Sequence, residues 1–367
     1  MSTSSKIGVG IVGLSATRGW ASLAHIPALD VVADFEIRAL SASSPRSARD
    51  AAEKHGVGAP CASADELVHR DDVDLVVITV KVPDHFELVT AALRAGKAVF
   101  CEWPLGRNLQ EAEELTALAA RVGAPTFAGL QARSAPPIRY LRHLVDDGAV
   151  GTVLSTSVLA SGLRWAQTID SSRIYVLDRN NGATMLTIPF AHTIDGICHV
   201  LGQFSSVSAT TAVQQPLVRL VETNEYLAKS AEDQIVVQGT LDGGAIASIH
   251  FRAGLSGGTN FLWEINGDRG DIVVRGANGH LQYGFISIEM STNNQGLLPV
   301  AAPPSYRATP TDPSSYAHAV AEAYVQVAVD MRTGSRNAPS FHDALKRHQF
   351  LADVENSSAS GLRTMCS

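Results

Sequence analysis

The chain has 367 residues, of which 45% are apolar and 18% are charged, and its formal net charge is −7. This length fits two domains of roughly 100 to 200 residues better than one, and the apolar content excludes disorder as the main state. The acidic balance comes without a lysine and arginine cluster, which argues against nucleic acid as a partner. No apolar run reaches the roughly 18 to 20 residues of a membrane span, so we expect a soluble, cytoplasmic protein that does not bind membranes.

The cysteines are scattered along the chain without CxxC spacing, at Cys61, Cys101, Cys198 and Cys366. This distribution favours reduced thiols over a disulfide framework. It also gives no indication of a zinc site, and we expect no metal.

The first third of the chain alternates β-branched runs with Ala-, Leu- and Glu-rich segments of helical length. The predicted strands are residues 7–12, 36–41, 74–80, 98–101 and 125–130. The predicted helices between them are residues 24–29, 45–55, 85–95 and 108–122. Because such alternation buries a parallel sheet between two helical layers, it predicts an α/β fold with a doubly wound Rossmann domain over residues 1–130.

The remainder of the chain, residues 131–367, follows a different pattern. Helices are predicted at residues 137–146, 193–201, 316–332 and 341–357, the last two packing back on the body, and a proline-rich loop at 299–313. A strand is predicted at residues 153–160, followed by an irregular stretch to residue 181 and by strands at 206–213, 234–241, 245–251, 261–266, 271–275 and 280–290. Because consecutive strands joined by glycine-rich turns form antiparallel sheets, we predict an α+β domain on an open, mostly antiparallel sheet.

The first predicted strand contains a GxGxxG match, from Gly8 to Gly13. The match lies inside the strand, whereas a pyrophosphate is held where the strand ends and backbone N–H groups of the next helix point outward. Small residues at that end permit close backbone approach, and Ser15 and Thr17 add hydroxyl donors. The alternative interpretation is a tight strand-to-helix turn without a ligand.

The end of the second predicted strand bears on the choice of dinucleotide. An NAD-selective domain usually places a carboxylate there for the ribose 2′-hydroxyl. This chain instead has Ser43 and Arg46 nearby, which allow a 2′-phosphate. We therefore expect either NAD or NADP as the cofactor.

Four further motifs lie at residues 80–85 (VKVPDH), 102–104 (EWP), 130–133 (LQAR) and 190–195 (FAHTID). Together with the phosphate turn they resemble the glucose-fructose oxidoreductase/inositol dehydrogenase (Gfo/Idh/MocA) family, in particular the branch that includes the fungal galactose-regulon repressor. The resemblance covers nearly the whole chain. It implies a sugar-like small-molecule substrate and a homodimer or homotetramer formed through the C-terminal sheet.

The resemblance also implies cofactor roles, carried over position by position. The pyrophosphate would lie on Gly13, Ser15, Ala16 and Thr17. The ribose and phosphate side would be lined by Thr79, Val80, Pro83 and His85. Glu102 and Gln131 would flank the nicotinamide, and Trp103 would stack on it or on the sugar. His25 and His85 are interpreted as cofactor or packing residues rather than catalysts.

The chain departs from the family at two catalytic positions. The dehydrogenases usually carry a proton-transferring lysine where this chain has Trp103, whose indole N–H donates but cannot accept a proton at neutral pH. They also commonly place an aspartate where this chain has Ile188. His192, with an ordinary pKa of about 6.5, is the best remaining proton-transfer group. If His192 opens the helix that follows, Asp195 lies one turn on and influences it.

Four more residues are expected to contact the substrate: Arg133, Arg164, Trp165 and Tyr175. A guanidinium and aromatic faces suit a polyol or sugar. The competing interpretations are an ion pair between domains for Arg133 and a core aromatic for Trp165.

Three functions fit these observations. The first is an NAD(P)-dependent oxidoreductase acting on a sugar, cyclitol or related hydroxyl or carbonyl compound, with His192 in place of the lysine; this is the function we expect. The second is a glycosidase in which the cofactor transiently oxidises a sugar hydroxyl. The third is a cofactor-binding regulator without turnover, which the replacement of the lysine by Trp103 favours.

Overall fold

The computed structural model describes residues 5–292 and 295–366. Their contacts divide the chain into two units, residues 1–134 with 307–345, and residues 135–306 with 346–367. We expected one boundary, at residue 130, and the chain passes from the first unit to the second close to it, after Ser134. The chain then returns to the first unit over residues 307–345.

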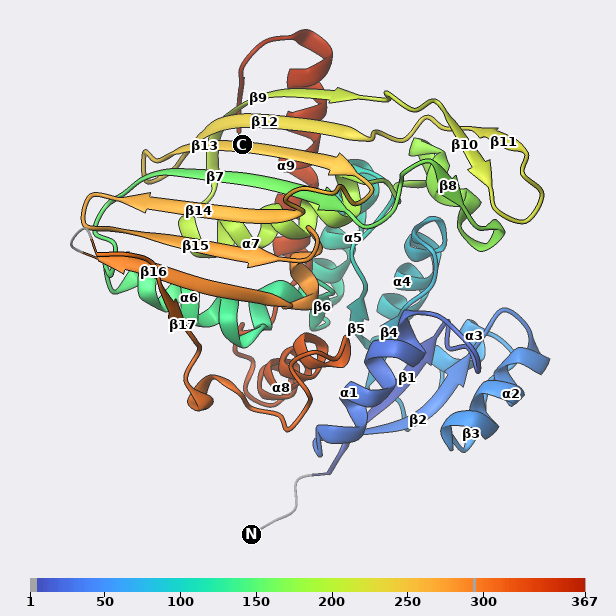
Figure 1. Cartoon of the computed structure of the whole chain (residues 1–367). Helices are drawn as coiled ribbons and strands as arrows, with labels where there is room; N and C mark the ends of the chain where they lie inside the picture. The colour runs from blue at the N-terminus through green and yellow to red at the C-terminus, as the bar shows by residue number, and fades with distance from the viewer. Residues whose placement is uncertain (1–4, 293–294, 367) are drawn as a thin grey trace. The chain divides into compact units, whose positions relative to one another are not determined.

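The first unit contains a parallel sheet with helices on both faces (Figure 1). Its strands are β1 (Ile7–Val12), β2 (Phe35–Ser41), β3 (Ala59–Pro60), β4 (Leu75–Ile78), β5 (Ala98–Cys101) and β6 (Thr126–Ala128), in the order β3-β2-β1-β4-β5-β6. Every residue of β1, β4 and β5 is buried, as expected for strands covered on both faces. The prediction of a doubly wound Rossmann sheet is confirmed.

Seven longer helical segments surround this sheet. They are η1 (Ala21–His25, a π-helical turn), α1 (Ile26–Val31), α2 (Pro45–His55), α3 (Ala64–Val68), α4 (His85–Arg94), α5 (Leu109–Val122) and α8 (Ala317–Thr333). The sequence did not predict α3 or β3, because five and two residues are too short to show a periodicity. A helix is predicted at residues 24–29, whereas the helical run begins earlier, at Ala21.

Helix α8 belongs to the first unit although it is almost 200 residues further along the chain. Its Val320, Tyr324 and Val327 are buried in the same apolar cluster as β1, β2 and α1. Its small residues allow close packing, since Ala317, Ala321 and other alanines lie in that cluster too. Helix α9 (Phe341–Ser360) begins in the first unit and contributes its residues from Lys346 onward to the second.

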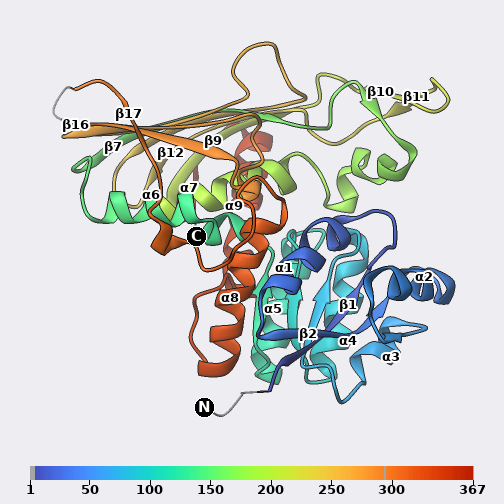
Figure 2. The same ribbon diagram turned by 60° about the horizontal axis from the view of Figure 1, so that its bottom comes forward.

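The second unit is built on a sheet of nine strands. They are β7 (Val153–Gly162), β9 (Phe204–Ala212), β12 (Gln234–Leu241), β13 (Ile246–Ala253), β14 (Phe261–Gly267), β15 (Gly270–Gly276), β16 (Ile286–Thr292), β17 (Leu298–Val300) and β18 (Thr364–Met365). Only the β7–β13 pair among the described strands of this sheet is parallel, so the predicted mostly antiparallel sheet is confirmed. Figure 2 shows α6 (Pro136–Asp146) and α7 (Ala191–Leu201) along one face of it.

Three parts of the second unit differ from expectation. The predicted strand 280–290 is wrong at its start, because Leu281–Tyr283 form a 3-10 turn that ends at Gly284 with φ +72° and β16 begins only at Ile286. The predicted loop 299–313 overlaps β17 and a 3-10 turn, η8 (Pro304–Tyr306). A small sheet of β8 (Thr168–Ile169), β10 (Leu217–Leu220) and β11 (Tyr226–Ala228) was not predicted, since its strands are too short for a clear alternation.

Two absences hold for the residues that the structure describes. None of their helices is long and apolar enough to cross a membrane. No group of three or more His, Cys, Asp or Glu side chains among them is arranged to hold a metal ion.

Candidate functional site

The carboxyl ends of β1, β2 and β4 meet at Gly13, directly after β1. Gly13 N–H donates to the carbonyl of Ser41 at 3.0 Å, and the Thr79 N–H and hydroxyl both donate to the carbonyl of Val12. Strand order reverses between β1 and β4, and in open α/β sheets ligands bind beyond the strand ends at such a switch point. The predicted phosphate turn therefore lies where a dinucleotide site is expected.

Both the backbone conformation and the neighbouring atoms favour glycine at position 13. Its φ is +99°, and a Cβ atom would lie 2.7 Å from Cγ1 of Val80. By contrast Gly8 and Gly10 lie within β1, where a Cβ would meet the carbonyl oxygen of Asp72 at 2.0 Å and Cδ2 of Leu67 at 2.6 Å. The GxGxxG match thus serves packing, as predicted, and only its last glycine belongs to the turn.

The turn after Gly13 presents small polar groups. The Thr17 N–H donates to Oγ of Ser15 at 3.3 Å, and the Ser22 hydroxyl donates to the Ser15 carbonyl. Nε2 of His55 lies 3.3 Å from the same carbonyl, a contact that the sequence did not indicate. Ser15 and Ala16 are half-buried and Thr17 is exposed, so their backbone can be approached from solvent.

The β2 end carries no carboxylate between Ser41 and α2. Ser43 and Arg46 are both exposed, and the neighbouring Ser44 caps α2 by accepting the N–H of Ser47 at 3.1 Å. This arrangement leaves room for a ribose with or without a 2′-phosphate.

His85 holds two of the predicted cofactor loops together from beneath. Nδ1 of its buried ring lies 2.8 Å from the carbonyl of Pro104, and Nε2 lies 3.2 Å from that of Val80. A neutral imidazole donates only one hydrogen, and the shorter contact favours Nδ1–H. Burial lowers the pKa of His85, which keeps it neutral. His85 is 1% exposed, and its two ring nitrogens contact carbonyls of both loops. Pro83 lies in the same turn and is half-buried.

Glu102, Trp103 and Gln131 follow β5 and β6. Oε1 of Glu102 lies 3.0 Å from Nε2 of His25, and Trp103 is buried ahead of a cis peptide bond to Pro104. Gln131 is 2% exposed, and its Oε1 has no hydrogen-bond partner among the described residues. Because buried polar atoms are normally paired, this orphan acceptor is consistent with a missing ligand. The glycine turn and Gln131 thus fit a dinucleotide.

Arg133 pairs within the first unit. Its NH1 lies 2.9 Å from Oδ1 of Asp343, whose Oδ2 accepts the N–H and hydroxyl of Ser340 at the start of α9. Arg133 thus has an ion-pair partner within its own unit.

His192 lies in the second unit, in the middle of a helical run. The π-helical turn η6 (Leu186–Phe190) leads directly into α7, so the expectation that His192 opens a helix is wrong. Its ring is 3% exposed, and Nδ1 has no hydrogen-bond partner among the described residues. Burial lowers the pKa of His192 to about 3, well below the 6.5 expected from its sequence. The imidazole is thus neutral at physiological pH, with one ring nitrogen available.

Asp195 follows one turn later and is fully buried. Its Oδ1 lies 3.7 Å from Nε of Arg347, a residue of α9 that also donates to Gln203. This ion pair places an opposite charge beside the buried carboxylate.

Trp165 takes the left-handed conformation, with φ +61°, which is rare and strained for a bulky residue. Nζ of Lys229 donates to its carbonyl at 3.2 Å and to Oδ2 of Asp233 at 2.9 Å. The indole is 7% exposed, and Nε1 has no partner among the described residues. Tyr175 is half-buried, and burial raises its pKa.

The structure adds His280 and Gln282, which the sequence did not single out. The His280 ring stacks on Tyr283 (5.0 Å between centroids, 4° between planes) and on Trp165 (6.3 Å, 19°). Nε2 of His280 accepts the N–H of Leu163 at 3.2 Å, and Nδ1 lies 3.2 Å from the amide nitrogen of Gln282. Burial, with smaller contributions from His192 and Arg164, lowers the pKa of His280 to about 3. The predicted residues His192 and Trp165 thus lie around one imidazole.

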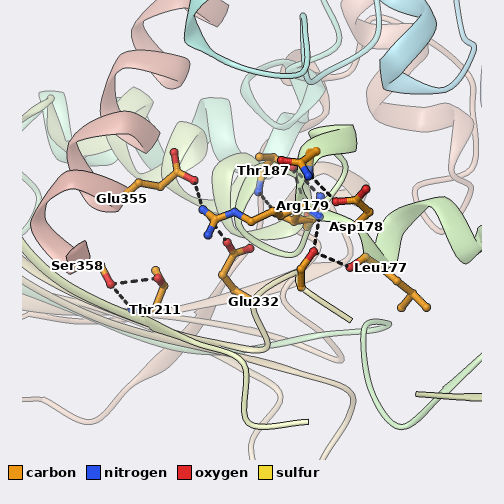
Figure 3. Close-up of polar contacts among 11 residues, drawn as sticks. Leu177, Asp178, Arg179, Thr187, Thr211, Glu232, Glu355 and Ser358 are labelled. Carbon is orange, nitrogen blue, oxygen red and sulfur yellow. Dashed lines mark hydrogen bonds and ion pairs between the residues drawn. The ribbon is translucent and has the colours of Figure 1, made fainter. Parts of the chain in front are cut away.

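The segment that leads into η6 is fixed by Arg179 (Figure 3). Its guanidinium lies 2.9 Å from Oε1 of Glu355 and 3.5 Å from Oε1 of Glu232, while its N–H donates to Oγ of Ser230. Thr187 in turn donates to the carbonyl of Gly182 at 2.7 Å. Burial raises the pKa of Glu232. These contacts hold the chain that carries His192.

A parallel sheet of this strand order, with a glycine turn at its switch point and a second α+β unit, defines a dinucleotide-binding protein of the Rossmann class. The model of the oxidoreductase family with an NAD-binding Rossmann fold matches residues 7–130, and the model of the Gal80p C-terminal domain matches residues 136–276. The chain belongs to the Gfo/Idh/MocA oxidoreductase family, and its cofactor is a nicotinamide dinucleotide.

Individual relatives include both enzymes and regulators. The chain is 31% identical to the dehydrogenase aclE of Aspergillus oryzae over 74% of this chain and 78% of that one. It is 28% identical to the galactose/lactose metabolism regulatory protein GAL80 of Saccharomyces cerevisiae, over 80% of this chain and 72% of that one. A levoglucosan dehydrogenase solved with NADH and levoglucosan shares the fold, with a TM-score of 0.85, 19% identity and coverage of 99% and 100%.

Proposed function

We propose that the chain is an NAD(P)-dependent oxidoreductase that oxidises a hydroxyl group of a sugar, cyclitol or related compound. The observation that carries this proposal is the buried, neutral imidazole of His192, whose Nδ1 lacks a hydrogen-bond partner among the described residues. Such an atom is costly unless a ligand supplies the missing contact. Membership of the oxidoreductase family supports the reaction class.

When bound, the cofactor would supply the hydride acceptor. The residues at its phosphates would be Gly13, Ser15, Ala16 and Thr17, and Glu102 and Gln131 would flank the nicotinamide. His192 would accept the hydroxyl proton. Although its low pKa makes it a weak base, the hydroxyl becomes strongly acidic as the hydride leaves, so a neutral imidazole suffices in this direction. For the reverse reduction, the same imidazole would return the proton to the carbonyl oxygen.

The substrate would lie on the second unit, and this part of the proposal has its own support. Trp165 Nε1 and Gln282 Oε1 are, like His192 Nδ1, buried polar atoms without a hydrogen-bond partner among the described residues. Two of these groups lie against the ring of His280, and the third interacts with it electrostatically. Donors and acceptors of this kind match the hydroxyl groups of a polyol. Tyr175 and Arg164 would add contacts.

A cofactor-binding regulator without turnover is the second candidate. Trp103 stands where the dehydrogenases have a lysine, and residues 136–276 match the Gal80p C-terminal domain. In that case the same dinucleotide site would gate binding of a peptide partner. In either case we propose that copies associate through the face of the nine-stranded sheet opposite α6 and α7 (Figure 2).

One experiment separates these functions. The purified chain is mixed with NAD⁺ or NADP⁺ and a panel of sugars, cyclitols and glycosides, while reduced nicotinamide and released aglycone are followed. Reduced nicotinamide supports the dehydrogenase, aglycone alone supports a glycosidase cycle, and bound cofactor without either product supports the regulator.

The role of His192 is tested by His192→Ala. We expect turnover to fall by roughly 100-fold or more with cofactor affinity unchanged, because a proton-transfer group contributes about that factor. His250→Ala, at a half-buried histidine of β13, is the matched control. Equal rates for His192→Ala and wild type would reject the assignment.

A further inference from the structure

Three side chains of the first unit, two of them fully buried, form a hydrogen-bonded row that ends at Glu102. The hydroxyl of Tyr324, in α8, lies 2.7 Å from Nδ1 of His25, at the end of η1. Nε2 of His25 lies 3.0 Å from Oε1 of Glu102, just after β5. His25 and Tyr324 are each 0% exposed, whereas the Glu102 side chain keeps 13% of its surface exposed. The row therefore runs from the core to a carboxylate at the edge of the cofactor site.

The hydrogens in this row have one consistent arrangement. An ionised carboxylate only accepts, so Nε2 of His25 must carry the hydrogen that points to Glu102. Nδ1 of a neutral ring is then an acceptor and takes the hydroxyl hydrogen of Tyr324. Burial raises the pKa of Tyr324 well above its ordinary value, so this hydroxyl keeps its hydrogen. Each donor and acceptor is thus matched in a single direction.

Packing fixes both rings of the row. Phe100 stacks on Tyr324 with centroids 5.4 Å apart, and it meets the His25 ring edge-on at 5.6 Å. The carboxylate is also confined from the opposite side, since a Cβ at Gly129 would lie 2.7 Å from Oε1 of Glu102. Glu102 therefore has little freedom to turn away from its histidine partner.

We propose that His25 and Tyr324 are positioning residues that hold the Glu102 carboxylate in place and directed toward the nicotinamide, so that the cationic oxidised ring is bound in preference to the neutral reduced ring. The physical reason is that a carboxylate with limited solvent contact interacts more strongly with a nearby positive charge than it would in water. The inference rests on the proposed function in one respect, the place of Glu102 beside the nicotinamide.

The test measures binding by calorimetry rather than activity. NAD⁺, NADH and ADP-ribose, which lacks the nicotinamide, are titrated separately into the full chain, with NADP⁺ and NADPH in parallel. We expect Glu102→Gln to reduce the preference for the oxidised cofactor by about 10-fold, equivalent to about 1.4 kcal/mol. His25→Leu should also reduce the preference for the oxidised cofactor. Tyr324→Phe should reduce this preference by about threefold, because the imidazole of His25 loses the partner that fixes its tautomer.

Two comparisons separate positioning from a general loss of structure. In His25→Gln, the amide nitrogen can replace Nε2 as the donor to Glu102, so most of the preference should return. Thr116→Val removes a hydroxyl that donates within α5 of the same unit at 2.7 Å, and it should change nothing. ADP-ribose affinity should be the same in all variants, whereas a merely structural role would weaken all ligands alike.

The outcomes are distinguishable. An unchanged ratio of oxidised to reduced affinity in Glu102→Gln, with both still bound, overturns this inference and leaves the oxidoreductase proposal intact. A wild-type chain that binds none of the dinucleotides overturns both. The ratio of oxidised to reduced affinity could also shift in Glu102→Gln but stay unchanged in His25→Leu and Tyr324→Phe. That result would show that the charge of Glu102 sets the preference and would reject His25 and Tyr324 as positioning residues.

Discussion

Arg347 lies 3.7 Å from the carboxylate of Asp195, measured from Nε to Oδ1, and both side chains are buried. Their separation in sequence is 152 positions, so α7 and α9 bring them together. The pair gives the buried carboxylate of α7 a nearby opposite charge. It also gives Asp195 a partner, Arg347, that the sequence did not indicate.

Breaking this pair should destabilise the second unit strongly. Asp195→Asn leaves a buried guanidinium without its counter-charge, and such losses cost about 3–5 kcal/mol. Asp195→Asn with Arg347→Met removes both charges and should recover part of that loss. Urea unfolding of the single and double variants measures the coupling. If instead the double variant is no more stable than Asp195→Asn, the two charges do not compensate each other.

The left-handed Trp165 gives a second prediction. Lys229 holds its carbonyl and is itself paired with Asp233, and both charged side chains are at most 1% exposed. The double variant Lys229→Met/Asp233→Asn removes this support without leaving an unpaired charge. If the proposed oxidoreductase activity holds, we expect a several-fold higher KM for the sugar or cyclitol substrate, with cofactor affinity unchanged. A KM equal to that of wild type would show that Trp165 keeps its place without Lys229.

A third prediction concerns Gly13. Gly13→Ala introduces a Cβ 2.7 Å from Val80 at φ +99°, so the turn must shift. We expect cofactor affinity to fall by at least about 10-fold, or about 1.4 kcal/mol. Gly56→Ala, at φ +68° with no atom within 4 Å of the added Cβ, imposes a similar backbone strain without the clash. Gly56→Ala should lose stability but bind cofactor normally. Equal cofactor affinities of Gly13→Ala and Gly56→Ala would contradict the prediction.

Stability should fall steeply on acidification. The folded pKa values of His192 and His280 are about 3, and both start from 6.5 in the unfolded chain. Between pH 6.5 and pH 3 the unfolded state takes up protons that the folded state does not. Each group therefore contributes stability that is present above pH 6.5 and is lost at about 1.4 kcal/mol per pH unit below it.

Unfolding midpoints in urea at pH 7.5, 6 and 5 measure this effect. In His280→Gln the free energy of unfolding should fall less steeply as the pH is lowered, because the contribution of one imidazole is removed. His69→Gln removes an exposed histidine and should leave the slope unchanged. A slope in His280→Gln that matches wild type would show that His280 titrates normally in the folded chain.

The sequence by itself determined the local elements and the place of the phosphate turn. Strand β1 and the turn at Gly13 follow from a β-branched run and from glycine, and the antiparallel strands of the second unit follow from alternation and turn residues. These are properties of neighbouring residues, and the structure reproduces them within a few positions. The identity of the cofactor class followed from the same local motifs.

Only the tertiary structure decided which distant side chains meet. Tyr324 lies 299 positions from His25, and no local pattern marks an apolar, alanine-rich helix such as α8 as part of the first unit. The pKa of His192 is likewise set by the atoms packed around it rather than by its neighbours in sequence. The physical reason is that propensity and periodicity act over one or two turns of chain, whereas burial and hydrogen-bond partners depend on elements packed together from hundreds of residues apart.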